Sequence, residues 1–195
     1  DFARSLAREQ LDISDLTRTV NAMLDRLEEI LGSPRGIKKN APANYRDQKG
    51  KIILFSGCQH LKDREKHRGV PKDLIGFDEI PNFLKDQFTF IKGWNRSTKP
   101  GQRSRVICTG NRPVTSEQMW VIEYWGAWLD PNHPNPALPG ELRWYATVNG
   151  QELECDGPGQ VIVDDVPQFD KDGKPLMPIS RTFIPAGLQD NPDLS

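Results

Sequence analysis

Apolar residues recur at two spacings along the chain, and each spacing predicts one kind of element. Helical spacing over residues 14–31 predicts an amphipathic helix. Helical spacing returns after Pro81, in the first turn of a second expected helix, and again after the capping box at residues 115–118. Continuous apolar runs predict three buried strands, at residues 51–56, 74–77 and 105–109. Helices and strands therefore alternate, which indicates an α/β core in three layers.

The second part of the chain has a different pattern. Four prolines fall within residues 131–139 and mark an irregular connection. Apolar segments on either side of Asn149-Gly150 then predict a β-hairpin with a type I′ turn, and residues 170–173 predict another tight turn. We therefore expect a core over residues 1–130 and a β-hairpin-rich extension over residues 131–195.

The composition narrows the class of protein. The 195 residues carry a net charge of −1, so the chain lacks the overall basic charge of a protein that coats nucleic acid. The three cysteines lie far apart and predict no disulfide framework, which fits a reducing compartment. No apolar run reaches the roughly 18 residues that a membrane span needs, so we expect no membrane partner.

The strand expected at residues 74–77 ends in two adjacent carboxylates, Asp78 and Glu79, and the next strand ends in Thr109-Gly110-Asn111. Nucleotide hydrolases of the P-loop type use such a pair of strand ends. One carboxylate holds Mg²⁺ through its water shell, and the other polarises the attacking water. A hydroxyl or amide on the neighbouring strand senses the terminal phosphate of ATP. A carboxylate pair after a buried strand is also common without catalysis, and the pattern alone leaves that alternative open.

The phosphate-binding motif of these enzymes, G-x-x-x-x-G-K-[ST], does not occur in the 195 residues. Residues 32–39 are faintly similar, but their spacing differs and Pro34 removes a backbone donor. The chain also begins at Asp1 rather than at a methionine, which indicates a fragment or a processed chain. We expect these residues by themselves to be inactive towards ATP.

Basic residues near the second functional strand are further candidates. Arg96 and Arg103, with the neighbouring Lys99 and Arg105, either contact phosphate or DNA or form a solvated face. Arg68 precedes the carboxylate strand and has the same two interpretations: it reaches a phosphate, or it caps a neighbouring element.

Two other groups of residues resemble functional sites only weakly. Three residues that often bind metals lie at a spacing that matches no common zinc site: Cys58, His60 and His67. Large aromatic residues follow the capping box at helical spacing, which is more typical of a core than of a surface that stacks on bases: Trp120, Tyr124, Trp125 and Trp128.

Taken together, these residues resemble the ATPase domain of the large subunit of bacteriophage terminases, the motors that package viral DNA. The resemblance is carried by Arg68-Gly69 and by residues 73–79 and 106–111. It is specific from about residue 50 onward and continues through Phe83 and through residues 93–98, 100–103, 120–122, 128–136, 139–144, 181–186 and 190–192.

The resemblance implies a partial P-loop NTPase-type sandwich of three layers with a mostly parallel sheet. The hairpin-rich extension then leads toward the linker to a nuclease domain. In this interpretation Asp78 holds Mg²⁺ through water and Glu79 is the catalytic carboxylate. Thr109, Gly110 and Asn111 form the motif that couples phosphate sensing to movement, and Arg68, Arg96 and Arg103 are candidate contacts to phosphate or DNA.

Two positions depart from the pattern of the family. Arg112 stands where a proline usually follows the asparagine, and Gln118-Met119 stand where a glycine is more frequent. We expect the first change to alter the loop without removing the sensing groups.

By the resemblance, the intact protein hydrolyses ATP with Mg²⁺ and drives double-stranded DNA into a procapsid in the cytoplasm of a bacterial host. It acts as a homo-oligomeric ring on the portal, with the small terminase subunit as a partner. Two alternatives stay open: an inactive prophage remnant that serves as an interaction module, and another nucleic-acid-dependent ATPase such as a helicase. A phosphate-loop lysine in the full reading frame would distinguish a motor from a remnant.

Overall fold

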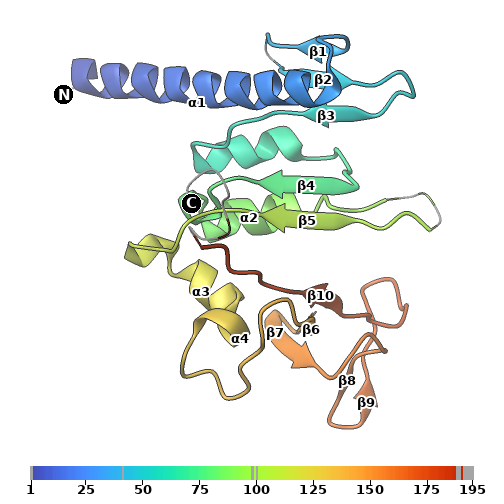
Figure 1. The fold of residues 1–195 in the computed structure, drawn as a ribbon. Helices are drawn as coiled ribbons and strands as arrows, with labels where there is room; N and C mark the ends of the chain where they lie inside the picture. The colour runs from blue at the N-terminus through green and yellow to red at the C-terminus, as the bar shows by residue number, and fades with distance from the viewer. Residues whose placement is uncertain (1, 41, 98, 100, 188–189, 191–195) are drawn as a thin grey trace. The chain divides into compact units, whose positions relative to one another are not determined.

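Mixed α/β secondary structure extends along the chain, with small sheets of two or three strands and one parallel strand pair. The computed structural model describes residues 2–40, 42–97, 99, 101–187 and 190, and it describes side chains from residue 17 onward (Figure 1). Some residues used in the sequence analysis lie outside this description: Asp1, Thr98, Pro100, Asn191 and Pro192.

The chain divides into two compact units, each made of two segments. The first unit comprises the residues up to 75 and residues 86–107, and the second comprises residues 76–85 and 108–195. The dividing line crosses the parallel pair formed by β4 (Leu74–Phe77) and β5 (Arg105–Cys108). The boundary that the sequence analysis places at residue 130 separates an expected core from a hairpin-rich extension. It is not a division by contacts between residues, and it stays a prediction.

A long helix and a three-stranded antiparallel sheet begin the first unit. The helix α1 (Phe2–Leu31) starts well before the predicted residue 14. The first 31 residues contain no glycine or proline, so an established helix extends through them at little cost. Leu24 is fully buried on its inner face. The sheet has the order β1-β2-β3, made of β1 (Ile37–Lys38), β2 (Asn44–Arg46) and β3 (Ile52–Leu54).

Strand β3 differs from the buried strand that its apolar run predicts. It pairs antiparallel with β2 at the edge of the sheet, and its three side chains are 45–53% exposed. Strand β4 also buries only alternate residues: Ile75 and Phe77 are buried, whereas Leu74 is 57% exposed. A continuous apolar run is compatible with burial on both faces, but it does not determine which elements cover those faces.

The rest of the first unit contains the 3₁₀ helix η1 (Leu61–His67) and most of α2 (Lys85–Lys92). Phe88 and Ile91 form the buried face of α2, as the helical spacing predicts. Gln87 is buried beside them, and its side-chain amide donates to the Cys58 carbonyl at 3.2 Å. That bond satisfies a polar group that would otherwise be costly to bury.

The second unit contains short helices and a three-stranded antiparallel sheet with the order β10-β6-β7. The hairpin of β6 (Arg143–Val148) and β7 (Gln151–Cys155) confirms the sequence prediction, because Asn149 and Gly150 both have positive φ, at 52° and 80°. The other elements of the unit are η2 (Ile80–Asn82), η3 (Ser116–Gln118), α3 (Trp120–Tyr124), α4 (Gly126–Leu129), β8 (Ile162–Val163), β9 (Val166–Pro167) and β10 (Ile179–Arg181).

The capping box at Thr115 and Gln118 is present, but it opens the short η3 rather than one continuous helix. The helical path breaks again at Trp125, where φ is −108° and ψ is 34°. Trp120 and Trp125 are 5% and 8% exposed, so both fill the core as their spacing indicates. Among the described residues, no helix combines the length and the apolarity needed to cross a membrane.

Arg181 at the end of β10 is the central buried charge of the second unit. Its side chain is 5% exposed, and its two terminal nitrogens donate to the Glu152 carboxylate at 2.9 and 2.7 Å. The guanidinium carbon lies 3.4 Å from the centre of the Tyr124 ring and 4.1 Å from that of Tyr145. It also donates to the Tyr124 carbonyl. One cation therefore connects β10, β6 and β7 with the end of α3.

Replacing Arg181 with methionine is expected to lower the free energy of unfolding by about 2–3 kcal/mol, because it leaves Glu152 without its partner. This loss of stability is small for the removal of one partner of a buried ion pair, because the Glu152 side chain is 40% exposed and keeps access to water. Urea unfolding followed by tryptophan fluorescence measures it. Arg112→Met, which removes an exposed arginine of the same unit, is the control. Equal stability of the two variants would contradict the role of Arg181.

Candidate functional site

The ends of β4 and β5 bring the predicted catalytic and sensing residues together. The two strands run in the same direction (Figure 1), so their carboxyl ends meet at one edge. Asp78 and Glu79 follow β4, and Thr109-Gly110-Asn111 follow β5. All five residues belong to the second unit. The strand assignment made from the sequence therefore places these groups correctly relative to one another.

Three hydrogen bonds fix one strand end to the other. The Thr109 amide donates to the Phe77 carbonyl at 2.9 Å, and the Ile80 amide donates to the Thr109 carbonyl at 2.8 Å. The Thr109 hydroxyl donates to Asp78 Oδ1 at 2.8 Å. The backbone bonds set the register of the two ends, and the side-chain bond orients the Asp78 carboxylate.

Glu79 has an unusual backbone conformation. Its φ and ψ are 52° and 54°, in the left-handed region that a residue with a Cβ atom enters at a cost of about 1 kcal/mol or more. This turn directs the chain from β4 straight into η2, which contains Pro81. The sequence predicted Pro81 in the first turn of the helix that carries Phe88 and Ile91, but that helix, α2, starts separately at Lys85. Residues held in such conformations often lie at functional sites. No pattern in the sequence predicts this conformation of Glu79.

Gly110 is required by the close approach of the two strand ends. A Cβ atom at this position would lie 2.7 Å from Pro81 Cδ, 3.0 Å from the Ile80 nitrogen and 3.3 Å from Glu79 Cα. The first distance is shorter than Cβ atoms in folded proteins show, and the other two are unusually tight contacts with backbone atoms, which cannot rotate away. The glycine therefore allows the β5 end to lie against the turn that carries Glu79.

Gln118 and Asn82 support the site, and the sequence analysis did not assign either of them a role there. Gln118 Oε1 accepts from the amides of Val114 and Thr115 at 2.9 and 3.3 Å, and Gln118 Nε2 donates to Asn82 Oδ1 at 3.3 Å. Gln118 thus joins the loop after β5 to η2. The capping box in the sequence predicts that the Gln118 side chain bonds to backbone amides at the start of the helix. The bond from Gln118 to Asn82 could not be predicted in this way, because Asn82 is 36 positions away.

A second set of contacts connects α3 with the same turn. The Trp120 indole N–H donates to the Phe83 carbonyl at 2.9 Å, and Lys85 Nζ lies 3.2 Å from the Glu123 carboxylate. The ring of Phe83 also packs edge-on against Phe77, with ring centres 5.2 Å apart. The turn that carries the carboxylates is therefore held from β4, β5 and α3.

The chemistry of this edge fits a magnesium–nucleotide complex held partly by water. Asp78, Glu79 and the Thr109 hydroxyl offer oxygen ligands, which Mg²⁺ prefers. Within the part of the chain that the structure describes, no three His, Cys, Asp or Glu side chains gather as a metal site. Mg²⁺ commonly uses one or two carboxylates together with waters and phosphate oxygens.

The basic residues predicted as phosphate contacts belong to the first unit. Arg68 Nη2 donates to Glu65 at 3.0 Å, and its guanidinium lies 5.1 Å from the centre of the Phe90 ring, so its charge already has a partner. Arg96 lies over the Trp94 ring at 4.5 Å. Arg103 is exposed in the connection before β5. Their predicted roles stay predictions.

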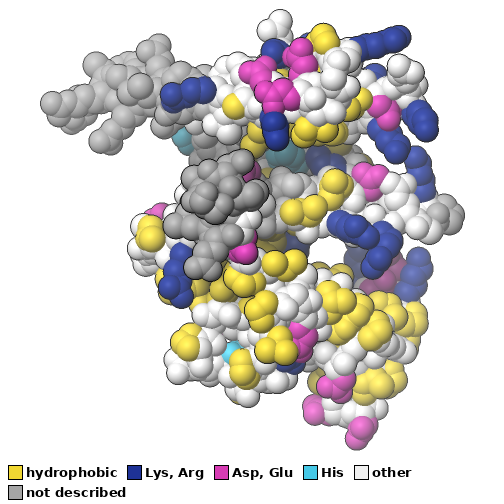
Figure 2. Space-filling view, viewed as in Figure 1, with side chains coloured by type: hydrophobic (Ala, Val, Ile, Leu, Met, Phe, Trp, Pro, Cys, Tyr) yellow, Lys and Arg dark blue, Asp and Glu magenta, His cyan; other side chains and the backbone are white. Residues whose placement is uncertain are grey.

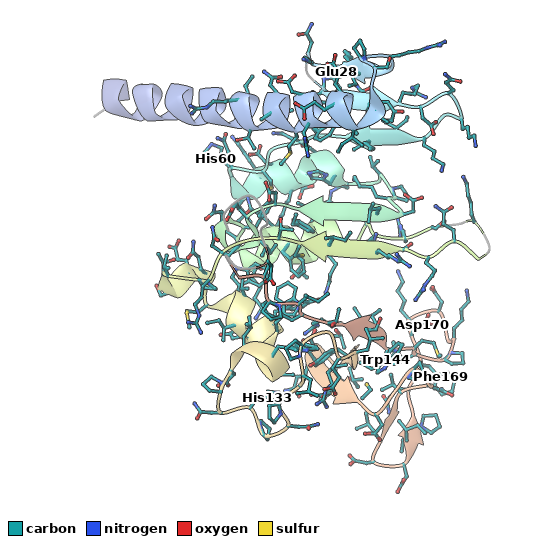
Figure 3. All side chains as sticks on the ribbon, in the orientation of Figure 1. Glu28, His60, His133, Trp144, Phe169 and Asp170 are labelled. Atoms are coloured by element: carbon teal, nitrogen blue, oxygen red, sulfur yellow. The ribbon has the colours of Figure 1, made fainter. Side chains whose placement is uncertain are left out.

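A pocket of about 260 Å³ lies elsewhere in the second unit, between α3, α4 and the sheet. His133 contributes from the loop after α4 (Figure 3), and Glu123, Tyr145 and Arg181 also line it. Most charges here are already paired, Arg181 with Glu152 and Glu123 with Lys85. The pocket therefore does not compete with the strand ends as a candidate site.

A comparison of the chain with known protein families, with curated proteins and with solved structures finds no match.

Replacing Gly110 with alanine is expected to separate the two strand ends and to lower the free energy of unfolding by about 2 kcal/mol. Amide hydrogen exchange at Ile80 is the sharper measurement, because this amide donates to the Thr109 carbonyl and should lose protection. Gly157→Ala is the matched control in the same unit, since a Cβ at Gly157 would meet nothing within 4 Å. Unchanged protection at Ile80 would contradict this account.

Proposed function

We propose that this chain is part of an ATP-hydrolysing motor of the terminase type, which drives double-stranded DNA into a viral procapsid. One observation carries the proposal. Two carboxylates follow one strand, and the first of them, Asp78, accepts a hydrogen bond from Thr109 in the Thr-Gly-Asn sequence at the end of the parallel neighbour. P-loop hydrolases need this combination of a metal carboxylate, a water-activating carboxylate and a sensing group.

Each residue has a distinct task in the proposed reaction. Asp78 holds the water shell of Mg²⁺, and the Thr109 hydroxyl keeps that carboxylate oriented. Glu79 orients and polarises the water that attacks the terminal phosphate. Asn111 offers both a donor and an acceptor, so it can exchange partners when that phosphate leaves.

The proposal requires a phosphate-binding loop that the 195 residues do not contain. Backbone amides and a lysine in such a loop supply most of the attraction for ATP phosphates. In the proposed fold, β4 and β5 belong to a larger, mostly parallel sheet with helices on both faces. By the resemblance of the sequence, the motor acts as a ring on the portal with the small terminase subunit, in a bacterial host.

Glu79→Gln is expected to keep ATP binding and to reduce turnover by at least about 100-fold, because an amide cannot polarise the water. Asp78→Asn should weaken Mg²⁺-dependent ATP binding as well. ATP hydrolysis and nucleotide affinity are measured on the protein in the form that its gene encodes. Glu117→Gln, at an exposed glutamate of the same unit, is the control. Normal hydrolysis by Glu79→Gln would overturn the assignment. No hydrolysis in any form would favour an interaction module.

Asn111→Ala is expected to reduce DNA translocation more than ATP hydrolysis, because the group that responds to phosphate release is lost while Glu79 remains. Both rates are measured on the same preparation. Asn132→Ala, at an exposed asparagine of the same unit, should change neither rate. A proportional loss of both rates in Asn111→Ala would indicate a catalytic or structural role instead.

A further inference from the structure

One segment carries positive charge without any acidic residue, although the net charge of the chain is −1. Residues 87–116 contain six Lys and Arg residues and no Asp or Glu. The connection at residues 95–105 also has no aliphatic or aromatic side chain and consists of Asn, Arg, Ser, Thr, Lys, Pro, Gly and Gln. Its composition is that of a surface for a polar, negatively charged ligand.

The fold gathers this charge at the start of β4 and β5, within the first unit. The Arg96 amide donates to the Lys72 carbonyl at 2.9 Å. The Asn95 side chain donates to the Lys72 and Arg105 carbonyls at 3.1 and 2.9 Å. Lys72, Arg96 and Arg105 are therefore held next to one another by their backbones. We call Lys72, Arg96, Lys99, Arg103 and Arg105 the basic surface.

These cations are not neutralised by the protein itself. Among the described residues, no carboxylate forms an ion pair with any member of the basic surface. Some other basic residues of the first unit do have partners: Arg26 pairs with Glu29, Lys39 with Asp25, and Arg68 with Glu65. Asp73 is the nearest acid in the sequence, and its carboxylate accepts from the Gln102 side chain instead.

Other basic residues of the first unit lie outside the basic surface as defined. Figure 2 shows Lys and Arg side chains along the same end of the first unit, also over the turn between β2 and β3. Arg46, Lys49 and Lys51 are the exposed basic residues of that turn, and within the described part of the chain none of them has an ion pair. Like charges repel, so leaving them together without partners disfavours the folded chain unless a ligand compensates.

Trp94 shows which part of a nucleic acid this surface suits. The Arg96 guanidinium carbon lies 4.5 Å from the centre of the Trp94 ring, and this cation–π contact restrains the Arg96 side chain. The covered face of the indole is not available to stack on a base. Planar, oriented guanidinium groups match phosphate oxygens with two parallel hydrogen bonds. The contact between Arg96 and Trp94 therefore favours binding to the phosphate backbone of a nucleic acid rather than to its bases.

We propose that the basic surface binds the sugar–phosphate backbone of duplex DNA without reading its sequence. The inference rests on the proposed function for the choice of DNA, while the surface itself is argued from unpaired charge and composition. A protein partner fits less well, because protein interfaces bury an apolar centre and residues 95–105 offer none. Lys72 and the three arginines contact phosphates, and the hydroxyl groups of Ser97 and Ser104 between them add hydrogen bonds.

The test measures binding of the chain to two 20-base-pair duplexes of unrelated sequence by fluorescence anisotropy, without nucleotide, over a range of salt concentrations. The triple variant Arg96→Gln, Arg103→Gln, Arg105→Gln should bind at least about tenfold more weakly, and the slope of log affinity against log salt should fall by about three. Both duplexes should bind within about threefold of each other.

Two further variants make the result specific. Arg18→Gln, Arg26→Gln, Lys62→Gln removes the same charge from exposed residues of the first unit and should change affinity little. The triple variant Arg96→Lys, Arg103→Lys, Arg105→Lys keeps the charge and should retain the slope of log affinity against log salt. Thermal unfolding of each variant checks that it is folded.

The outcomes separate this inference from the proposed hydrolysis. Wild-type affinity in the glutamine triple variant, or an equal loss in the control, would overturn it. A strong preference for one duplex would overturn backbone contact. Binding of a polyglutamate peptide but not of DNA would indicate an acidic protein partner instead. Loss of hydrolysis in Glu79→Gln with unchanged DNA binding supports both assignments, and DNA binding in a protein that never hydrolyses ATP overturns only the proposed motor.

Discussion

The pairing of two parallel strand ends is the constraint on which the candidate site depends. The Thr109 amide and carbonyl are both bonded to the β4 end, so the two turns that follow the strands cannot move independently. Gly110 makes this possible because its missing Cβ leaves room for Pro81. The left-handed Glu79 then turns the chain into η2, and the Asp78 carboxylate is left within reach of the Thr109 hydroxyl.

Charge is treated differently in the two units. In the second unit the buried Arg181 has the Glu152 carboxylate and two tyrosine rings as partners, as a desolvated cation requires. In the first unit Arg96 and Arg105 remain exposed and without an acidic partner among the described residues. The paired Arg181 stabilises the fold of the second unit. The unpaired Arg96 and Arg105 do not stabilise the first unit in this way, and binding of an anionic ligand would explain why they lie together.

Local rules explain which elements the sequence predicted well. Asn149-Gly150 requires positive φ at two consecutive residues, so the hairpin of β6 and β7 was predicted together with its turn. The bounds of β4 and the burial of Trp120 and Trp125 followed from short apolar patterns in the same way. The predicted helix began only at residue 14, although residues 2–13 also contain helix formers and no glycine or proline, so that α1 is longer than predicted.

The sequence by itself determined which residues stand at the strand ends, because strand length and carboxylate position are local properties. Only the tertiary structure decided that Thr109 bonds to Asp78, that Glu79 is left-handed and that Gln118 reaches Asn82. It also decided that β3 lies at the edge of a separate antiparallel sheet. Each of these depends on atoms distant in the chain, and the free energy of such a contact is not encoded in any single segment.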